Sequence, residues 1–163
     1  MSSKHRIAIS EWVVAEAPAT LVCYGLGSCL GIALYDRTSG IGGLAHTLLP
    51  SPPAEGTIGR PGRFVTSAIE LIREELTYRG SLAENLTAKI VGGANMFEMF
   101  NNTGGPGVGA RNTAAARATL ESLGVPIAGE DVGANFGRSM EFDLATGEVR
   151  VRTVANRKEA RVL

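Results

Sequence analysis

Apolar and polar positions alternate through the first third of the chain with the two-residue period of β-strands. Four strands are predicted there, over residues 6–16, 21–24, 30–35 and 41–49. Pro18 ends the first strand, and the segment from Asp36 to Gly40 has the composition of a turn. The amino-terminal third is therefore predicted to be a run of sheet.

The hydrophobic period changes after a loop rich in proline and glycine at residues 50–62. From Phe64 onward the apolar residues recur at spacings of three and four, which predicts an amphipathic helix of about four turns that stops at Gly80. A second helix is predicted over residues 112–123, where Gly124 and Pro126 follow it. The long loop comes directly after the strand that carries His46, and loops of this length often border a functional site.

Short strands and turns fill the rest of the chain. Strands are predicted over 86–91, 125–128, 139–144 and 149–154, with a hairpin turn at 145–148. Residues 96–100 are predicted to be helical, 101–109 to form a glycine-rich loop and 156–163 to fray. Because strands come in runs interrupted by two helices, the pattern favours an α+β fold in layers over an alternating parallel sheet.

Length and composition narrow the class of protein. A chain of 163 residues is the size of one domain with its own core, so residues 1–163 are predicted to form a single domain. Sixteen basic residues balance sixteen acidic ones, and no basic stripe with interleaved aromatics is present, which argues against nucleic acid as a partner. No apolar run approaches a membrane span, so a soluble, cytoplasmic protein without membrane insertion is expected.

The turn from Gly25 to Cys29 is the most suggestive stretch for chemistry. Its glycines allow the backbone amides to converge on one point, and the flanking strands would hold the turn rigidly. A cysteine nucleophile needs a nearby base, and the chain has only two histidines, His5 and His46. Since His5 lies in a loose amino terminus, His46 is the candidate base, with the amides of Ser28 and Cys29 as candidate oxyanion donors.

Residue types alone leave other interpretations open. Cys29 can equally be a small buried hydrophobe, and His46 a hydrogen-bonded strand residue. Cys23 can orient the base, act as a resolving thiol or pack in a strand. The glycine runs lack the lysine of a phosphate loop and the dinucleotide fingerprint, and two cysteines with one usable histidine do not complete a zinc site, so no cofactor or metal is expected.

Five blocks of sequence, in order along almost the whole chain, resemble the chemoreceptor glutamine deamidase family (CheD) of bacterial chemotaxis. The blocks run over residues 25–29, 43–50, 89–97, 109–112 and 131–138. Where the family often has threonine as its third catalytic residue, this chain has Cys23, whose thiol is a weaker hydrogen-bond partner for an imidazole. Ala110 and Ala134 replace a glutamate and a glycine of the family pattern.

The resemblance implies a fold, an activity and partners. The fold would be a three-layer α/β/β sandwich, similar to the catalytic domain of cytotoxic necrotizing factor toxins. The activity would be hydrolysis of receptor glutamines to glutamates, and possible receptor methyl-ester hydrolysis, with Cys29 as nucleophile and His46 as base. The substrate would be the cytoplasmic helices of chemoreceptors, and a CheC-type phosphatase would be a binding partner.

Two rival functions stay open at this stage. The protein can be a catalytically weak binding module that regulates a CheC-type phosphatase, an idea motivated by Cys23 in place of threonine. It can also be a thiol redox protein that uses Cys23 and Cys29, although their spacing differs from the Cys-x-x-Cys of that chemistry.

Overall fold

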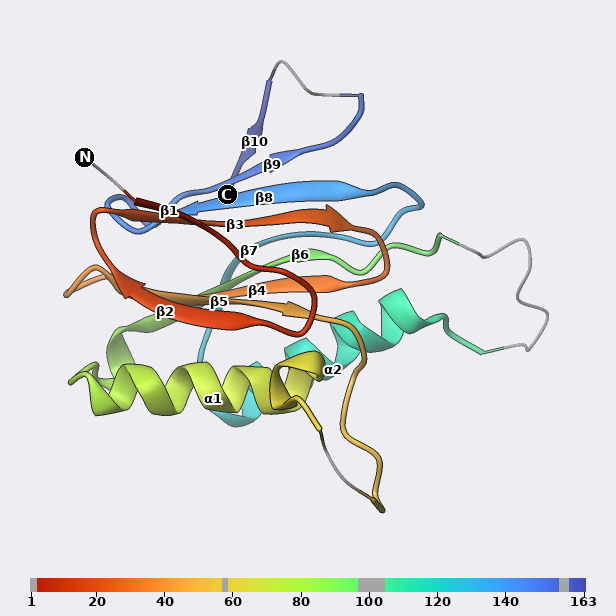
Figure 1. Ribbon diagram of the computed structural model, residues 1–163, viewed down its shortest axis with the longest axis horizontal. Helices are drawn as coiled ribbons and strands as arrows, with labels where there is room; N and C mark the ends of the chain where they lie inside the picture. The colour runs from red at the N-terminus through yellow and green to blue at the C-terminus, as the bar shows by residue number, and fades with distance from the viewer. Residues whose placement is uncertain (1–2, 57–58, 97–104, 156–158) are drawn as a thin grey trace.

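The computed structural model describes residues 3–56, 59–96, 105–155 and 159–163. In these residues two five-stranded sheets pack face to face, and the two α-helices cover the outer face of one of them (Figure 1). The predicted α+β fold with three layers, α/β/β, is confirmed.

The two sheets have different strand orders. The first sheet consists of β1 (Ser3–Arg6), β3 (Ala19–Leu26), β8 (Arg138–Asp143), β9 (Val149–Arg152) and β10 (Arg161–Val162), in that spatial order. The second consists of β2 (Trp12–Glu16), β5 (Ile41–Thr47), β4 (Leu30–Asp36), β6 (Leu86–Gly92) and β7 (Ile127–Val132). The helices are η1 (Pro61–Arg63), α1 (Val65–Tyr78), η2 (Ala83–Asn85) and α2 (Val108–Ser122). None of the described helices is long and apolar enough to cross a membrane.

The second sheet is buried on both faces, which explains why β4 reads as a continuous apolar run. Leu30, Ile32 and Leu34 point towards the helices and belong to one hydrophobic core. Ala33 of the same strand, together with Leu44 of β5, belongs to a second core between the two sheets. The inter-sheet layer is the one that contains the candidate site.

One predicted strand, over residues 6–16, is wrong as a single element. The chain turns at Ser10, whose φ is 71°, so that β1 lies in the first sheet and β2 in the second. The apolar alternation continues across this turn although Ile7 is buried and Ile9 is exposed, so hydrophobicity alone does not reveal the break.

Two other predicted boundaries need correction. α2 begins at Val108, four residues before the predicted start, because its first turn contains the glycine and polar residues that suggest a loop. β7 spans Ile127–Val132 rather than 125–128, and its Glu130 and Asp131 disguise a strand that pairs in parallel with β6. The predicted helix at 96–100 falls almost entirely outside the described residues.

The carboxyl terminus does not fray as predicted. β10 pairs antiparallel with β9, and Leu163 exchanges two backbone hydrogen bonds with Val149. The Lys89 ammonium donates to the carbonyl oxygens of Leu163, at 2.7 Å, and Gly147, at 2.8 Å. The last residues are thus tied to the first sheet by main-chain hydrogen bonds and to the second sheet by the Lys89 side chain.

Candidate active site

Cys29 lies in the turn between β3 and β4, immediately before the first residue of β4. In the antiparallel pairing of β4 with β5, Gly31 is directly opposite His46. Side chains two residues apart in a strand share a face, so Cys29 lies on the same face as His46, diagonally across the two strands. Cys29 belongs to the inter-sheet core, as does Leu44 of β5, two residues before His46.

His46 is held in a defined orientation. Its Nδ1 atom lies 3.1 Å from the carbonyl oxygen of Ile7, and because a carbonyl only accepts, Nδ1 carries the proton. Nε2 is buried and has no hydrogen-bond partner among the described residues. The neutral ring therefore presents an unprotonated Nε2, the atom that a general base uses.

The connection between β1 and β2 provides this contact. Ile7 is the first residue after β1, where the chain begins to cross from one sheet to the other. The crossing is pinned to β5 by two backbone hydrogen bonds, from Ser10 N to His46 O at 2.8 Å and from His46 N to Glu11 O at 3.0 Å. The turn that breaks the predicted strand is thus the element that orients the imidazole.

Burial makes the uncharged form of each group the favoured one. Desolvation lowers the pKa of His46, with smaller opposing effects from the Ile7 carbonyl and the Glu11 carboxylate. Desolvation also raises the pKa of the Cys29 thiol, partly offset by the backbone N–H of Cys29 itself. The resting pair is therefore a thiol and a neutral imidazole, rather than a thiolate and an imidazolium.

The main chain of the turn is fixed by three hydrogen bonds to its carbonyl oxygens. Ala94 N donates to Gly27 O, Asn112 Nδ2 to Ser28 O and Gly93 N to Cys29 O, each at 2.9 Å. In a trans peptide the N–H points opposite to the C=O, so the first two bonds also set the directions of the Ser28 and Cys29 amides. These are the two amides that the sequence suggests as oxyanion donors.

Gly92 and Gly93 form the seat on which this turn rests. A Cβ atom at Gly92 would lie 2.2 Å from the carbonyl oxygen of Cys29, and Gly92 has a φ of +116°. At Gly93, a Cβ atom would lie 2.4 Å from Thr113 Oγ1 on α2. Because neither residue has a side chain, this glycine pair allows the end of β6, the cysteine turn and α2 to approach one another closely.

Cys23 is fully buried on β3 and lies in the same inter-sheet core as Cys29. Both thiols are free. Burial, with a smaller effect from Cys29, raises the pKa of Cys23 well above its ordinary value. His46 Nδ1 donates its hydrogen bond to the main-chain carbonyl of Ile7 rather than to this side chain.

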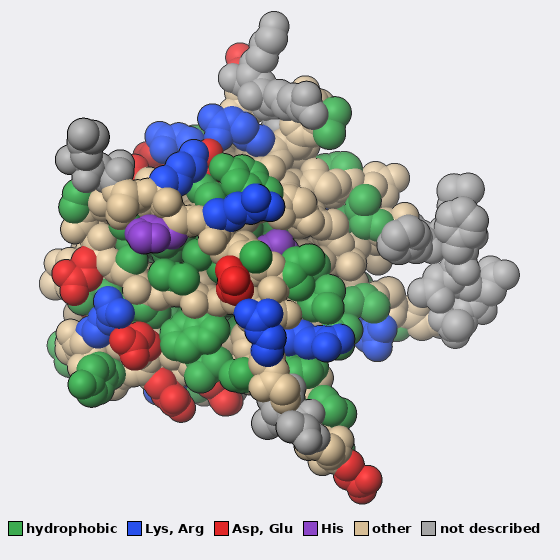
Figure 2. Space-filling model, viewed as in Figure 1, with side chains coloured by type: hydrophobic (Ala, Val, Ile, Leu, Met, Phe, Trp, Pro, Cys, Tyr) green, Lys and Arg blue, Asp and Glu red, His purple; other side chains and the backbone are tan. Residues whose placement is uncertain are grey.

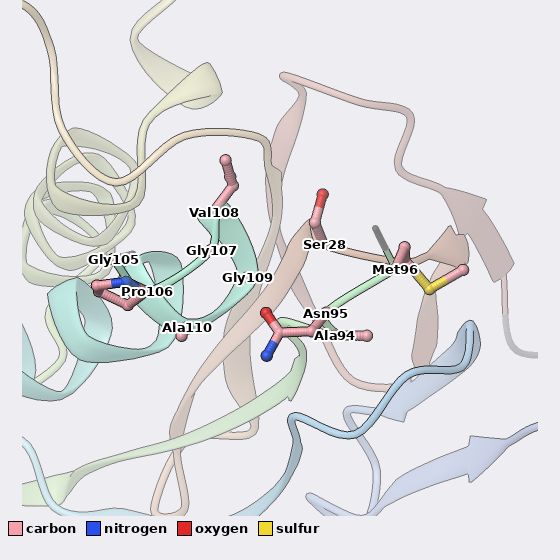
Figure 3. Close-up of a pocket in the computed structure, with 10 residues that line it drawn as sticks. All are labelled: Ser28, Ala94, Asn95, Met96, Gly105, Pro106, Gly107, Val108, Gly109 and Ala110. Atoms are coloured by element: carbon pink, nitrogen blue, oxygen red, sulfur yellow. The ribbon is translucent and has the colours of Figure 1, made fainter. Parts of the chain in front are cut away.

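Two cavities have lining residues next to the site, although neither Cys29, 7% exposed, nor His46, 3% exposed, lines a cavity among the described residues. A cavity of about 460 Å³ has Ser28 and Asn95 on one side and Gly107 and Val108 on the other (Figure 3). A second, of about 730 Å³, is lined by residues of the Ser10 turn, the chain after His46 and the segment just before α1. Basic side chains gather near the start of α1 (Figure 2), and Arg60 and Arg63, which precede that helix, line the second cavity.

Two parts of the site were not assigned from the sequence. The Ile7 carbonyl is a main-chain atom and leaves no signal in residue types. Asn112 does leave one, because it precedes Ala116 and Leu120 at four-residue spacing and so continues the buried face of α2. The polar character of Asn112 on an otherwise apolar helix face therefore indicates a role in the site more clearly than its location in a glycine-rich segment does. Among the described residues, no three His, Cys, Asp or Glu side chains gather as a metal site would require.

Comparison with known proteins identifies the family to which this site belongs. A family model described as CheD, chemotactic sensory transduction, matches residues 48–153. The chain belongs to the CheD family. It is 50% identical over 155 residues, 94% of this chain and 96% of the other, to a probable chemoreceptor glutamine deamidase, CheD 2, of Geobacter metallireducens. It is 38% identical over 153 residues, 94% of each chain, to a protein of Thermococcus kodakarensis with the same name apart from the number.

Likeness to solved structures is weaker than likeness to these CheD sequences. The crystal structure of Neisseria meningitidis protein NMB0706 overlaps with 82% of this CheD chain and 63% of its own, at a TM-score of 0.49 and 12% sequence identity. The family assignment therefore comes from the sequence relatives.

Proposed function

We propose that this CheD protein hydrolyses the side-chain amide of specific glutamines on chemoreceptors, with Cys29 as nucleophile and His46 as general base. The names of its relatives support the substrate and the reaction class. The observation that carries the choice of residues is the imidazole of His46, which shares a face with Cys29, donates from Nδ1 to Ile7 and keeps a free Nε2.

The first half of the reaction would form a thioester. Nε2 of His46 takes the thiol proton as the Cys29 sulfur attacks the carboxamide carbon, and the Ser28 and Cys29 amides donate to the oxyanion. Each such donor is worth roughly 3 to 4 kcal/mol in comparable enzymes. The C–N bond then breaks, and ammonia leaves with the proton held by His46.

The second half would regenerate the enzyme. Water gives a proton to Nε2 of His46 and attacks the thioester carbon, the C–S bond breaks, and the sulfur recovers the proton. The products are a glutamate side chain and the free thiol. A receptor methyl ester would pass through the same thioester with methanol as the leaving group, so methyl-ester hydrolysis is a related proposal of the same site.

The decisive experiment incubates the full chain with a receptor cytoplasmic fragment and measures released ammonia together with the amide-to-acid mass change of receptor peptides. Cys29→Ala should abolish both signals, since the proposed thioester forms on its sulfur. Cys23→Ala is the matched control because it removes the other thiol of the same core. Retention of full activity in Cys29→Ala would exclude the cysteine mechanism.

The low exposure of both groups favours one alternative, a catalytically weak binding module for a CheC-type phosphatase. The two functions are separated by running the ammonia assay beside a pull-down with a CheC-type phosphatase. Binding without any ammonia release by the wild-type chain would support the binding module. Ammonia release that depends on Cys29 would support the enzyme whether or not the phosphatase binds.

A further inference from the structure

Asn112 makes two hydrogen bonds that neither the family resemblance nor the reaction requires. It lies on α2, and its side chain is fully buried. Its Nδ2 atom donates to Ser28 O at 2.9 Å and to Leu48 O at 3.1 Å, 84 and 64 residues away in sequence. Because both partners are carbonyls, which only accept, the atom that faces them is the amide nitrogen with its two N–H groups.

The two carbonyls belong to the two segments that carry the chemistry. Ser28 immediately precedes Cys29, and Leu48 follows His46 by two residues. The ladder between β4 and β5 ends at the pair Leu30 and Thr47, so its strand pairing stops one residue short of Cys29 and Leu48. Asn112 continues the connection beyond that point through a single side-chain nitrogen.

We propose that Asn112 is a positioning residue that sets the separation of the Cys29 sulfur from the His46 imidazole and the direction of the Cys29 amide. This inference rests on the proposed function. The peptide between Ser28 and Cys29 has its C=O bound to Asn112, so its N–H is directed to the opposite side, where the oxyanion would form. The bond to Leu48 anchors the strand end beyond the base.

The chemistry of the side chain explains why asparagine suits this place. Its amide nitrogen has two protons, one for each carbonyl, whereas an aspartate would direct an oxygen at two carbonyl oxygens. The Oδ1 atom is buried with no hydrogen-bond partner in the described part of the chain. Buried unpartnered polar atoms are rare, and they are tolerated where the group serves a function.

The test compares Asn112→Asp, Asn112→Ala and Asn112→Ser in the full chain, with Ser122→Ala as the control on the same helix. Ser122 is the last residue of α2, and its hydroxyl donates to Thr119 O within the helix, far from the cysteine turn. For each variant kcat and KM are measured with a receptor fragment, and the rate of Cys29 alkylation by iodoacetamide is measured against pH. Thermal melting reports on folding.

The expected result is a fall in kcat of roughly 10²-fold for Asp and Ala, the cost of displacing a reacting group by about an ångström, with KM little changed. The Cys29 alkylation profile should shift in these variants, because the thiol no longer faces the imidazole and amide in the same way. Ser, with one O–H donor, should fall between them and the wild type. Ser122→Ala should match the wild type in kcat and in alkylation.

Several outcomes would overturn the inference. One is a wild-type kcat in folded Asn112→Ala or Asn112→Ser; another is a loss of melting temperature with an unchanged alkylation profile, which indicates packing alone. If the wild-type chain releases no ammonia, the proposed function fails, and the alkylation profiles still decide the role of Asn112. An unshifted profile in that case overturns the inference as well.

Discussion

The Nδ1 atom of His46 on β5 donates a hydrogen bond of 3.1 Å to the carbonyl oxygen of Ile7, at the point where the chain leaves the opposite sheet. A main-chain carbonyl does the work that a side chain does in many Cys–His sites, which is to fix the ring and its tautomer. Substitution cannot remove such an acceptor. In the proposed mechanism Cys23, in the place where the family often has threonine, does not have to hold the base.

The lowered pKa of His46 predicts the position of the acid limb of activity. A histidine with its ordinary pKa near 6.5 would lose its neutral form as the pH falls through that value, whereas burial here keeps the ring neutral to lower pH. We expect kcat/KM to hold steady from pH 7 to 6.5 and to fall only at more acidic pH. A pH–rate profile of ammonia release checks this, and a midpoint above 6.5 would contradict it.

His46→Gln is expected to lower kcat by roughly 10²- to 10⁴-fold, the usual contribution of general acid–base catalysis. A glutamine amide fills similar space but does not accept a proton near neutral pH. The remaining activity should therefore lack the acid limb of the wild-type pH–rate profile. Steady-state kinetics with a receptor fragment measure this. His5→Gln is the control because that side chain is exposed on β1, where its ring shares a hydrogen bond with the Ser3 hydroxyl; a comparable loss there would rule out a specific role for His46.

Cys23→Ala should leave kcat within about threefold of wild type, an effect well under 1 kcal/mol on the activation free energy. The reason is that Ile7, and not Cys23, accepts from His46. The loss of a small buried side chain should instead lower stability by about 1 kcal/mol, visible in denaturant unfolding. A fall in kcat as large as that of His46→Gln would restore Cys23 as a third catalytic residue.

Alkylation under native conditions should modify Cys29 and spare Cys23. Cys29 is 7% exposed, and its own backbone N–H lies near the sulfur and stabilises the thiolate. Cys23 is fully buried, and burial holds its pKa far above neutrality. Mass spectrometry of peptides after iodoacetamide treatment should find one adduct in the native protein and two after denaturation. Equal reaction of both thiols would instead favour the redox interpretation.

Gly92→Ala is expected to reduce both stability and activity, because its Cβ would lie 2.2 Å from the carbonyl oxygen of Cys29 and push the turn away. Gly25→Ala is the matched control, since Gly25 also has a positive φ, +67°, but open space around it. The control should cost about 1 to 2 kcal/mol of backbone strain only. Denaturant unfolding and ammonia release are measured for both, and equal losses would remove the steric explanation.

The sequence by itself determined the buried strands and the first long helix, because hydrophobic period reports burial directly. The buried strands 30–35, 41–49 and 86–91 and the helix from Phe64 to Gly80 agree with β4, β5, β6 and α1 to within a few residues. The choice of Cys29 and His46 as the reactive pair remains a prediction of that stage. Geometry now supports it through the shared face and the free Nε2.

Only the tertiary structure decided how the pair is held. The chain turns at Ser10 to cross from one sheet to the other. Two contacts then join segments that are remote in sequence: His46 donates to the Ile7 carbonyl, and Asn112 donates to two distant carbonyls. Most of these contacts use main-chain atoms, which every residue possesses, so residue types do not announce them. These contacts form only when the chain folds and brings the two sheets and α2 together around the cysteine turn.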